Sequence, residues 1–441
     1  MESNQDIPPS SLAPTGIPLA NETSRRELLR VVVATSLVNG LEIFNFTVFG
    51  FFAGMIGKQF FPAADPMTSL LLAVGTFGVG FFMRPFGAAV IGTYADRVGR
   101  RTAMTATIWL TAAGTAAVAV CPPYSMIGVA APLILVVGRS LQGFAAGGEM
   151  GAATTLVMEA GPVSRRGFRV SWQLASQGAA ALLGASLGTL LASVMSPGAL
   201  ESWGWRIPFL IGLLIVPVGL YVRRQGLADR NQETLRLVPR TPLAELCHEH
   251  GRTLALATLM IVGRTVPAYA IVLYMPSYLA HVMHLLPISG FLASAFSALV
   301  LVVVSPLSGL LADRLKRRKP LVLGASVATT VLIYPLFLLI THGHGLLPVL
   351  VGVGVISTLV ALTAGAGTLL ILEAFPLTVR ASGLAISYAL AVTLFGGTAQ
   401  FIVTALIKWT GNPMAVAWYV TGACLLSVVS LVLFKEHPAS I

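Results

Sequence analysis

Long apolar stretches separated by short polar loops run through most of this chain. About 20 apolar residues cover the roughly 30 Å of hydrocarbon in a bilayer, and a helix of that length satisfies its own backbone hydrogen bonds. By this criterion the hydrophobic pattern predicts twelve membrane-spanning helices. Their expected ranges are 28–56, 68–92, 102–121, 130–159, 168–195, 205–222, 253–280, 288–311, 320–340, 346–372, 379–408 and 414–434.

A long polar stretch divides these spans into two sets of six. We therefore expect an all-α integral membrane protein made of two six-helix bundles. The N-terminal segment is rich in Pro, Ser and Asn and has no apolar core, so we interpret it as a disordered cytoplasmic tail and not as a cleaved signal peptide. The expected order is a tail at 1–26, a bundle at 27–222, a cytoplasmic linker at 223–252, a second bundle at 253–434 and a tail at 435–441.

The composition excludes several classes of function. Of the 441 residues, 56% are hydrophobic and only 10% are charged, whereas soluble domains carry about 25% charged residues. The net charge of +11 would suggest nucleic acid in a soluble protein, but these cations lie in short loops between apolar runs, so no nucleic-acid partner is expected. No loop is long enough to build a soluble active site, and the three cysteines show no metal-binding spacing. We expect neither an enzyme nor a metal or other cofactor.

The cations also predict an orientation. With the N-terminus in the cytosol, the outer loops hold only Lys58, Arg206 and Lys408, and three further arginines fall inside apolar runs. The other 22 of the 28 Lys and Arg residues then lie on the cytosolic side. This bias places both termini in the cytosol. The predicted location is the bacterial inner membrane, with a lipid bilayer as the surroundings of a monomer.

Two signatures occur once in each half. GTYADRVGRR at 92–101 corresponds to GLLADRLKRR at 309–318, and MEAGPVSRRG at 158–167 corresponds to LEAFPLTVRASG at 372–383. The two pairs are offset by 217 and 214 residues, which indicates a duplicated six-helix unit. Such repeats place a binding site near the midplane of the membrane, between the halves.

The charges in these signatures predict a cytosolic gate. Paired charges at helix ends can lock the two bundles together and must separate when that side opens. The alternative is positive-inside charge combined with ordinary helix capping. The candidate gate residues are Asp96, Arg97, Arg100, Arg101, Glu159, Arg166, Asp313, Arg314, Glu373 and Arg380.

At these residues the sequence resembles the major facilitator superfamily, whose best-known signature is the D-R-x-G-R-R loop. FFMRPFGAAVIGTYADRVGRR at 81–101, GRSLQGFAAGGEMGA at 138–152 and WGWRIPF at 203–209 narrow the resemblance to the metabolite:proton symporter family. Within it the chain is most similar to the citrate and tricarballylate proton symporters of bacteria. The resemblance implies proton-coupled transport by alternating access.

The chain departs from the family pattern at several positions. The first helix of the family reads E-x-F-D-F, whereas this chain has Asn45 in place of the second acid. The proline that follows FGG-x in the family is absent, and Arg264 lies where citrate-type members tend to be rich in threonine. These departures bear on the substrate and on coupling.

Several charges fall inside the predicted spans, where each needs a partner, a water-filled cavity or a function. Arg84, Arg264 and Glu42 each lie twelve residues from a charge at the cytosolic side. That is roughly 18 Å along a helix, which is close to the midplane. Glu149 lies about midway along the fourth span. Arg139 falls in the outer part of the same span, where a structural pair near the outer face is one interpretation.

Guanidinium groups bind carboxylates with paired hydrogen bonds, so the arginines suggest an anionic substrate. A carboxyl group between a low-dielectric cavity and a nearby arginine can exchange protons. The alternatives are structural ion pairs and, for the polar residues, hydrogen bonds between packed helices. The candidates for substrate binding are Arg84, Arg264, Tyr269, Gln173 and Asn45, and those for proton coupling are Glu42 and Glu149.

The sequence thus predicts proton-coupled uptake of a small organic anion, such as a di- or tricarboxylate. The alternative is proton-driven efflux of a toxic or hydrophobic compound on the same fold, because a fold by itself does not assign a function.

Overall fold

The computed structural model describes residues 25–98, 100–147, 154, 157–158, 162–224, 243–376 and 379–436, and every structural statement below concerns these residues. The first half contains α1 (Arg25–Phe51), α2 (Ala53–Phe60), α3 (Pro66–Val98), α4 (Arg100–Val120), α5 (Tyr124–Ile127), α6 (Ala130–Ala146), η1 (Val163–Arg165), α8 (Arg166–Val194), α9 (Pro197–Ser202), η2 (Gly204–Arg206), α10 (Ile207–Gly212) and α11 (Ile215–Arg224). The second half contains α13 (Leu243–Ala268), η3 (Tyr269–Leu273), α14 (Met275–His281), α15 (Pro287–Arg314), α16 (Lys319–His342), α17 (Leu346–Leu362), α18 (Ala364–Ala374), α19 (Arg380–Ala391), η4 (Val392–Gly396), α20 (Ala399–Thr410) and α21 (Ala415–Leu433).

These elements account for all twelve predicted spans. Nine helices in the described residues are long and apolar enough to cross a membrane. A bent pair, Asn39–Phe51 with Ala53–Phe60, forms another span, and the shorter apolar helices Thr105–Val120 and Ala130–Ala146 lie in the third and fourth predicted spans. The all-α fold with twelve spans is confirmed.

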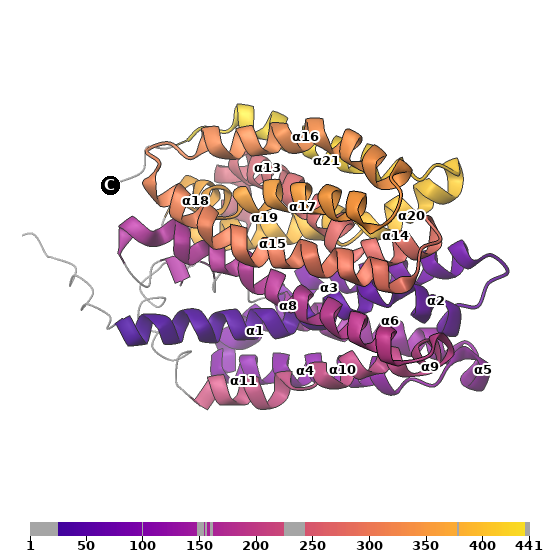
Figure 1. The fold of residues 1–441 in the computed structure, drawn as a ribbon. Helices are drawn as coiled ribbons and strands as arrows, with labels where there is room; N and C mark the ends of the chain where they lie inside the picture. Colours follow the sequence, from indigo (N-terminus) through magenta and orange to yellow (C-terminus); the bar gives the residue numbers. More distant parts are fainter. Residues whose placement is uncertain are drawn as a thin grey trace, which may run out of the picture.

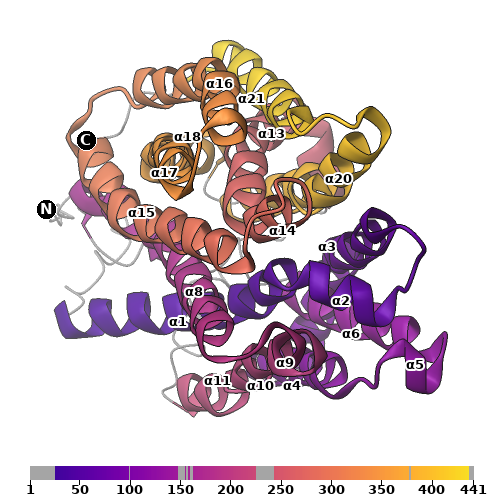
Figure 2. The same cartoon turned by 45° about the vertical axis from the view of Figure 1, so that its right-hand side comes forward.

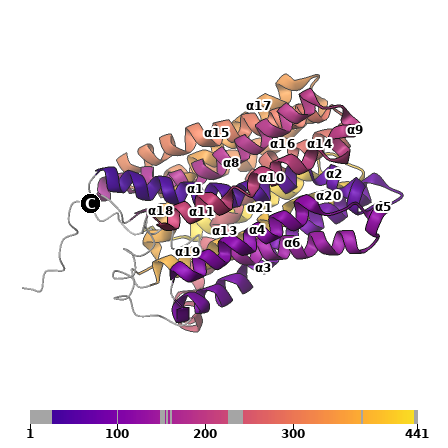
Figure 3. The same cartoon turned by 90° about the horizontal axis from the view of Figure 1, so that it is seen from below.

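The two halves form two bundles that lie side by side (Figures 1 and 2). Helix α8 of the first half packs along α15 of the second, and α3 packs against α20 and η4. The helices of both bundles run along roughly one direction, with α5 and α9 near one end and α18 near the other (Figure 3). We call the end that carries the predicted cytosolic loops the cytosolic end and the opposite end the outer end.

Three spans are interrupted where the two halves meet. The first span bends by 62° between α1 and α2. The seventh and eleventh spans contain the π-helical segments η3 and η4. Extra residues of this kind within a helix occur often at functional sites, because they change the direction of side chains locally. The hydrophobic pattern of the sequence did not reveal these interruptions.

Some helices extend beyond their predicted ranges. Helix α3 continues to Val98 and α4 begins at Arg100, so most of the predicted 92–101 loop is helical. Helix α13 begins at Leu243, inside the predicted linker, and kinks at His250 before it enters the membrane span. The rest of that linker, at 225–242, and the N-terminal tail up to residue 24 lie outside the described residues.

Glycines set how closely certain helices approach. A methyl group at Gly143 on α6 would collide with the backbone carbonyl of Gly80 on α3. At the cytosolic end, Gly167 on α8 and Gly309 on α15 are in similarly close backbone contact. Small residues allow this approach in a membrane, where helix association depends on packing and hydrogen bonds.

Candidate functional site

Arg84 on α3 lies in an aromatic environment formed by Phe46 and Phe81 of the first half. Its Cζ atom is 4.7 Å from the centre of the Phe46 ring and 4.5 Å from that of Phe81. The residue is only 5% exposed, and its Nε and Nη2 atoms have no hydrogen-bond partner in the described structure. Contacts with aromatic faces stabilise a desolvated cation by about 2 kcal/mol or more. They leave the N–H groups of the guanidinium available to an acceptor.

Arg139 on α6 contacts the same ring from another helix. Its Cζ atom is 4.3 Å from the Phe46 centroid, 4.7 Å from that of Phe49 and 5.2 Å from that of Phe77. The side chain is 0% exposed. We define the aromatic box as Phe46, Phe49, Phe77 and Phe81 together with the two arginines that contact these rings.

The hydrogen bonds of Arg139 are incomplete. Nη1 donates to Oε1 of Gln142 at 2.6 Å, and Gln142 in turn donates to Thr115 at 2.8 Å. Among the described residues, the Nε and Nη2 atoms have no hydrogen-bond partner. In the described residues, neither Arg139 nor Arg84 forms an ion pair with a carboxylate. The interpretation of Arg139 as one member of an ion pair near the outer face therefore has no support in this part of the structure.

The close packing of α3 on α6 brings the two arginines together. A methyl group at Gly80 would lie 3.1 Å from the Arg139 carbonyl and 3.7 Å from its Nη2 atom. Arg84 lies one helical turn beyond Gly80 and faces the same neighbour. The two guanidinium groups are close enough to repel each other electrostatically. A buried pair of like charges is costly, and a bound anion would relieve that cost.

The second half contributes polar side chains to the same place. The Tyr269 ring packs edge-on against Phe81, with centroids 5.6 Å apart, and Thr393 donates to the Phe81 carbonyl at 3.0 Å. Both residues belong to the π-helical segments, Tyr269 to η3 and Thr393 to η4. The aromatic box therefore lies at the junction of the two halves, where a transporter needs its substrate.

Gln400 on α20 also approaches the box, although in the sequence it resembles an ordinary helix-packing residue. A methyl group at Gly50 would lie 3.1 Å from the Gln400 Nε2 atom and 3.7 Å from the Phe77 ring. The Gln400 side chain is 1% exposed, and neither its nitrogen nor its oxygen has a hydrogen-bond partner in the part of the chain that the structure describes. An unsatisfied buried amide is expensive, which marks this position as a candidate for ligand contact.

Arg264 has a different environment. Its Nη1 atom donates to Thr368 on α18 at 2.9 Å. The residue lines a small pocket inside the second half, between α13, α16 and the tenth span. The other lining residues include Met260, Ser326, Thr329, Thr363 and Gly367.

Asn45 and Gln173 lie within the first half. Asn45 is 1% exposed and its Nδ2 atom donates to the carbonyls of Leu41, at 3.3 Å, and Gly212, at 3.5 Å. Gln173 lies on α8, where its backbone carbonyl accepts a hydrogen bond from the Ser176 hydroxyl at 2.8 Å. An amide suits position 45 because both of its partners are acceptors.

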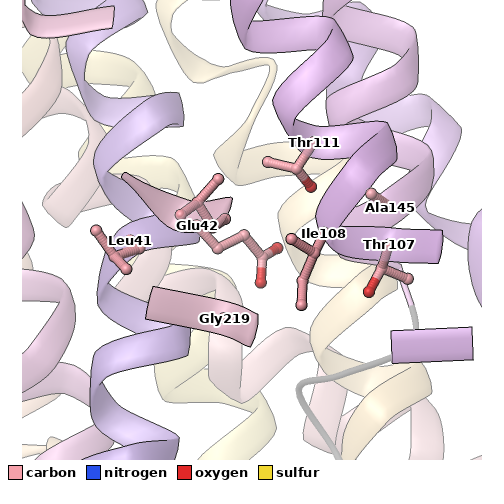
Figure 4. Close-up of a pocket in the computed structure, with 8 residues that line it drawn as sticks. Leu41, Glu42, Thr107, Ile108, Thr111, Ala145 and Gly219 are labelled. Carbon is pink, nitrogen blue, oxygen red and sulfur yellow. The ribbon is translucent and has the colours of Figure 1, made fainter. Parts of the chain in front are cut away.

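The carboxylate of Glu42 points away from α1 toward a small pocket (Figure 4). That pocket is lined by Leu41, Glu42, Thr107, Ile108, Thr111, Ala145, Ile215 and Gly219, from α1, α4, α6 and α11. The pocket is polar on its α4 side, where the two threonines lie. The second proton candidate, Glu149, lies outside the described residues.

At the cytosolic end, Asp313 joins the two halves. It lies in the last turn of α15 and accepts hydrogen bonds from the backbone N–H groups of Gly167, at 2.6 Å, and Phe168, at 2.9 Å. These groups form the N-terminus of α8, where a negative charge is favourable. The acid in GLLADRLKRR, the second copy of the first signature, thus caps a helix of the opposite half.

Other predicted gate residues have partners within their own half. Glu373 forms an ion pair with Arg318, a residue that was not among the predicted gate residues. Arg380 donates to the Leu372 carbonyl at 2.8 Å. Arg166 begins α8 and Arg314 ends α15. For the remaining predicted gate residues, the side chains lie outside the described part of the structure: Asp96, Arg97, Arg100, Arg101 and Glu159.

The two halves also meet at the outer end. Lys408, at the end of α20, pairs with Asp65 of the loop before α3 at 3.0 Å. The His281 ring lies directly against Gly54 of α2. The Phe291 ring packs against Phe52 with centroids 5.2 Å apart. The halves are therefore in contact at both ends, with the aromatic box between them.

Two duplicated bundles, with a charged aromatic box at their junction and contacts at both ends, define a membrane transporter. Comparison with known families agrees with this assignment. Residues 35–389 match the Major Facilitator Superfamily, and the chain belongs to that superfamily.

Individual relatives extend the comparison over nearly the whole chain. A citrate-proton symporter of Klebsiella pneumoniae is 35% identical over 396 residues, which cover 89% of this chain and 88% of the relative. A proline/betaine transporter of Escherichia coli K12 is 32% identical over 423 residues, covering 93% of this chain and 84% of the relative. A solved D-xylose-proton symporter shares the fold, with a TM-score of 0.74 at 16% identity, over 93% of this chain and 98% of that one.

These comparisons confirm the family resemblance and the fold. By family membership the chain is a multi-pass membrane transporter and not an enzyme. The relatives themselves carry both anions and zwitterions, so their names alone leave the substrate open.

Proposed function

We propose that this protein takes up a small organic anion, a di- or tricarboxylate, together with protons by alternating access. It would act in a bacterial inner membrane with both termini in the cytosol, as the distribution of Lys and Arg favours. The similarity to a citrate-proton symporter supports the anion and the proton coupling.

The observation that carries the proposal is the environment of Arg84. A guanidinium that is 5% exposed, without a carboxylate partner in the described residues and with two unbonded nitrogen atoms, is suited to bind a carboxylate. Tyr269 reaches the same aromatic box from the other half. A substrate held by both halves stabilises their closure around it, which is the requirement for alternating access.

The remaining substrate candidates would act in different ways. Arg264, which has a hydrogen bond to Thr368, would contribute mainly through the positive potential near the midplane. Asn45 would hold α1 against α10 and so position Phe46 and Phe49 of the box. Gln173 on α8 would contact substrate only in a more open arrangement of the halves.

For proton coupling we propose Glu42 and Glu149. The Glu42 carboxylate faces a small pocket with two threonine hydroxyls (Figure 4), and a carboxyl group with limited access to water can take up and release a proton as that access changes. Exchange of substrate without net proton movement should then survive when these carboxyls are replaced by amides.

We propose that the charges at the cytosolic end form the inner gate. The bonds from Gly167 and Phe168 to Asp313 hold α8 of one half against α15 of the other. These bonds must break when the cytosolic side opens. Asp65 with Lys408 would form a matching outer contact.

A binding screen followed by transport tests the proposed function. Purified protein is screened by thermal shift with citrate, succinate, glycine betaine and a hydrophobic cation, and then reconstituted into liposomes. We expect stabilisation by the carboxylates, and accumulation of labelled carboxylate when the outside is made acidic. Stabilisation by the hydrophobic cation, with proton-driven movement out of the cell, would instead support export.

A further inference from the structure

Arg139 has no role in the site proposed so far, and its surroundings are not those of a structural ion pair. Its guanidinium is completely buried among three phenylalanine rings, and its one hydrogen bond within the described residues goes to a neutral amide, that of Gln142. Its Nε and Nη2 atoms have no hydrogen-bond partner in the described part of the chain. Removal of a cation from water costs several kcal/mol per ion even after relaxation of the protein.

The position of Arg139 relative to Arg84 makes this cost larger. Both guanidinium groups contact Phe46, at 4.3 and 4.7 Å from its centroid, and they repel each other. One carboxylate bound between them would leave an excess positive charge. Two carboxylates would compensate both arginines.

Gln400 supplies a third unsatisfied group from the opposite half. Its amide lies beside Gly50, which also neighbours the Phe77 ring, and both of its polar atoms lack partners among the described residues. An amide can donate one hydrogen bond to a carboxylate and accept another from a hydroxyl group. The box therefore presents donors from both halves.

The aromatic rings also bear on the choice between substrate classes. A cluster of aromatic faces ordinarily attracts a quaternary ammonium group. Here the guanidinium groups of Arg84 and Arg139 already lie over all four rings. A betaine would bring its positive charge against two others, whereas a dicarboxylate would bring the opposite charge.

We propose that Arg139 is the second carboxylate-binding residue, and that the pair Arg84 and Arg139 makes this transporter specific for substrates with at least two carboxylates. Gln400 completes the site from the second half. This inference rests on the proposed uptake of organic anions and adds the feature that selects among them.

The test compares two ligands that differ by one charge. Binding of succinate and of monomethyl succinate to the purified full-length protein is measured by calorimetry at pH 7.5. For the unmodified protein we expect succinate to bind at least about 30-fold more tightly, because a hydrogen bond between charged groups contributes about 1.5–3 kcal/mol, and 1.4 kcal/mol corresponds to a factor of ten.

The variant Arg139→Gln should lose this preference. We expect its ratio of the two dissociation constants to fall to about 3 or less, through weaker succinate binding with little change for the monoester. Arg139→Lys keeps the positive charge but loses the planar guanidinium that donates two parallel hydrogen bonds. We expect this variant to have an intermediate ratio of the two dissociation constants. An unchanged ratio in Arg139→Gln would overturn the inference.

A second variant covers the case in which Arg139→Gln does not fold. Gln400→Glu is nearly isosteric and adds a negative charge beside Phe77, which would compete with the second carboxylate of the substrate. We expect succinate to lose about tenfold or more in affinity, and Gln400→Leu to lose less. Equal effects of Gln400→Glu on the diacid and on the monoester would contradict the inference.

The outcomes separate this inference from the proposed function. Tight binding of glycine betaine with no binding of succinate or citrate would refute both. Tight binding of carboxylates with a diacid preference that Arg139→Gln leaves unchanged would refute only the role of Arg139. A loss of preference confined to the Arg139 and Gln400 variants supports both.

Discussion

Arg84 and Arg264 have the same relation to the sequence and very different surroundings in the structure. Each lies twelve residues from a charge at the cytosolic end, in the second and seventh spans. Arg84 lies between two phenylalanine rings, and two of its guanidinium nitrogen atoms have no hydrogen-bond partner in the described residues. Arg264 donates to Thr368 and lines a pocket inside its own bundle.

The comparison shows that depth in the membrane and direction across a helix bundle are separate properties. Depth follows from the rise of 1.5 Å per residue and can be counted along the sequence. The direction in which a side chain points depends on which helix packs against that face of its own helix. Here the glycines of α3 and α6 let the two helices approach closely, which brings Arg84 near Arg139. In contrast, the hydrogen bond to Thr368 keeps the Arg264 side chain within the second half.

The largest expected effect comes from replacing the two arginines in turn. Arg84→Gln should weaken binding of citrate by about 100-fold, since it removes two bonds between charged groups. Arg264→Gln should weaken binding by about fivefold or less, because glutamine can still donate to Thr368. Calorimetry on the two purified variants measures both. Equal losses would show that the two arginines contribute alike and that the contrast between their environments has no functional meaning.

The packing of α3 against α6 offers a second way to test the contrast. Gly143→Ala places a methyl group against the Gly80 carbonyl and should destabilise the protein by about 1–3 kcal/mol. The same change should weaken citrate binding, since it separates Arg84 from Arg139. Thermal unfolding and binding are measured together.

Gly422→Ala is the matched control, because nothing lies within 4 Å of a methyl group added there. It should leave both stability and binding unchanged. A Gly143→Ala variant that behaves like Gly422→Ala would mean that the helices can separate without disturbing the arginines.

The gate contacts should affect access to the box more than affinity. Asp313→Asn weakens the bonds from Gly167 and Phe168, and should increase the population open to the cytosol by up to about tenfold. The rate of labelling of a cysteine placed at buried Ser171, in a cysteine-free background, reports this opening. Asp65→Asn breaks an outer contact and should slow the same labelling. Faster labelling in both variants would point to general loosening.

The smallest expected effect concerns pH at the outer end. Burial against Gly54 lowers the pKa of His281 below the ordinary value of 6.5, and the groups that act on it include Lys58, Glu201 and His284. The contact between the His281 ring and Gly54 favours the neutral form of the ring. This contact is therefore fully stable above about pH 6.5 and weakens as the pH falls below that value. We expect outer opening to increase a few-fold between pH 7.5 and 5.5.

Spin-label distances across the outer end measure this opening. In His281→Gln, which cannot be protonated, opening should no longer depend on pH in this range. A pH response of normal size in that variant would assign the effect to another group, such as a carboxyl inside the membrane.

Much of the fold was predictable from the sequence. Apolar length predicted all twelve spans, and the repeated acids predicted charged contacts at the cytosolic end. The helix caps formed by Asp313 could not be anticipated, because they join backbone groups of a different half. Likewise, η3 and η4 depend on local changes in helical hydrogen bonding that hydrophobicity does not record.

The candidate site was only partly predictable. The sequence identified Arg84 and Tyr269, which the structure brings to one aromatic box. It placed Arg139 in the outer part of its span and did not predict its contacts with Phe46, Phe49 and Phe77, because counting along one helix does not show which helix packs against it. Gln400 was indistinguishable from an ordinary packing residue. A signal was present in the four phenylalanines at 46, 49, 77 and 81, whose spacings of three and four residues place each pair on one helix face.

The most direct test is an experimental structure of the protein with bound citrate. We expect the ligand to lie at the aromatic box, with one carboxylate within hydrogen-bond distance of Arg84 and a second within reach of Arg139 or Gln400. Citrate bound instead in the pocket beside Arg264, with the Arg84 side chain unchanged, would contradict the proposed site.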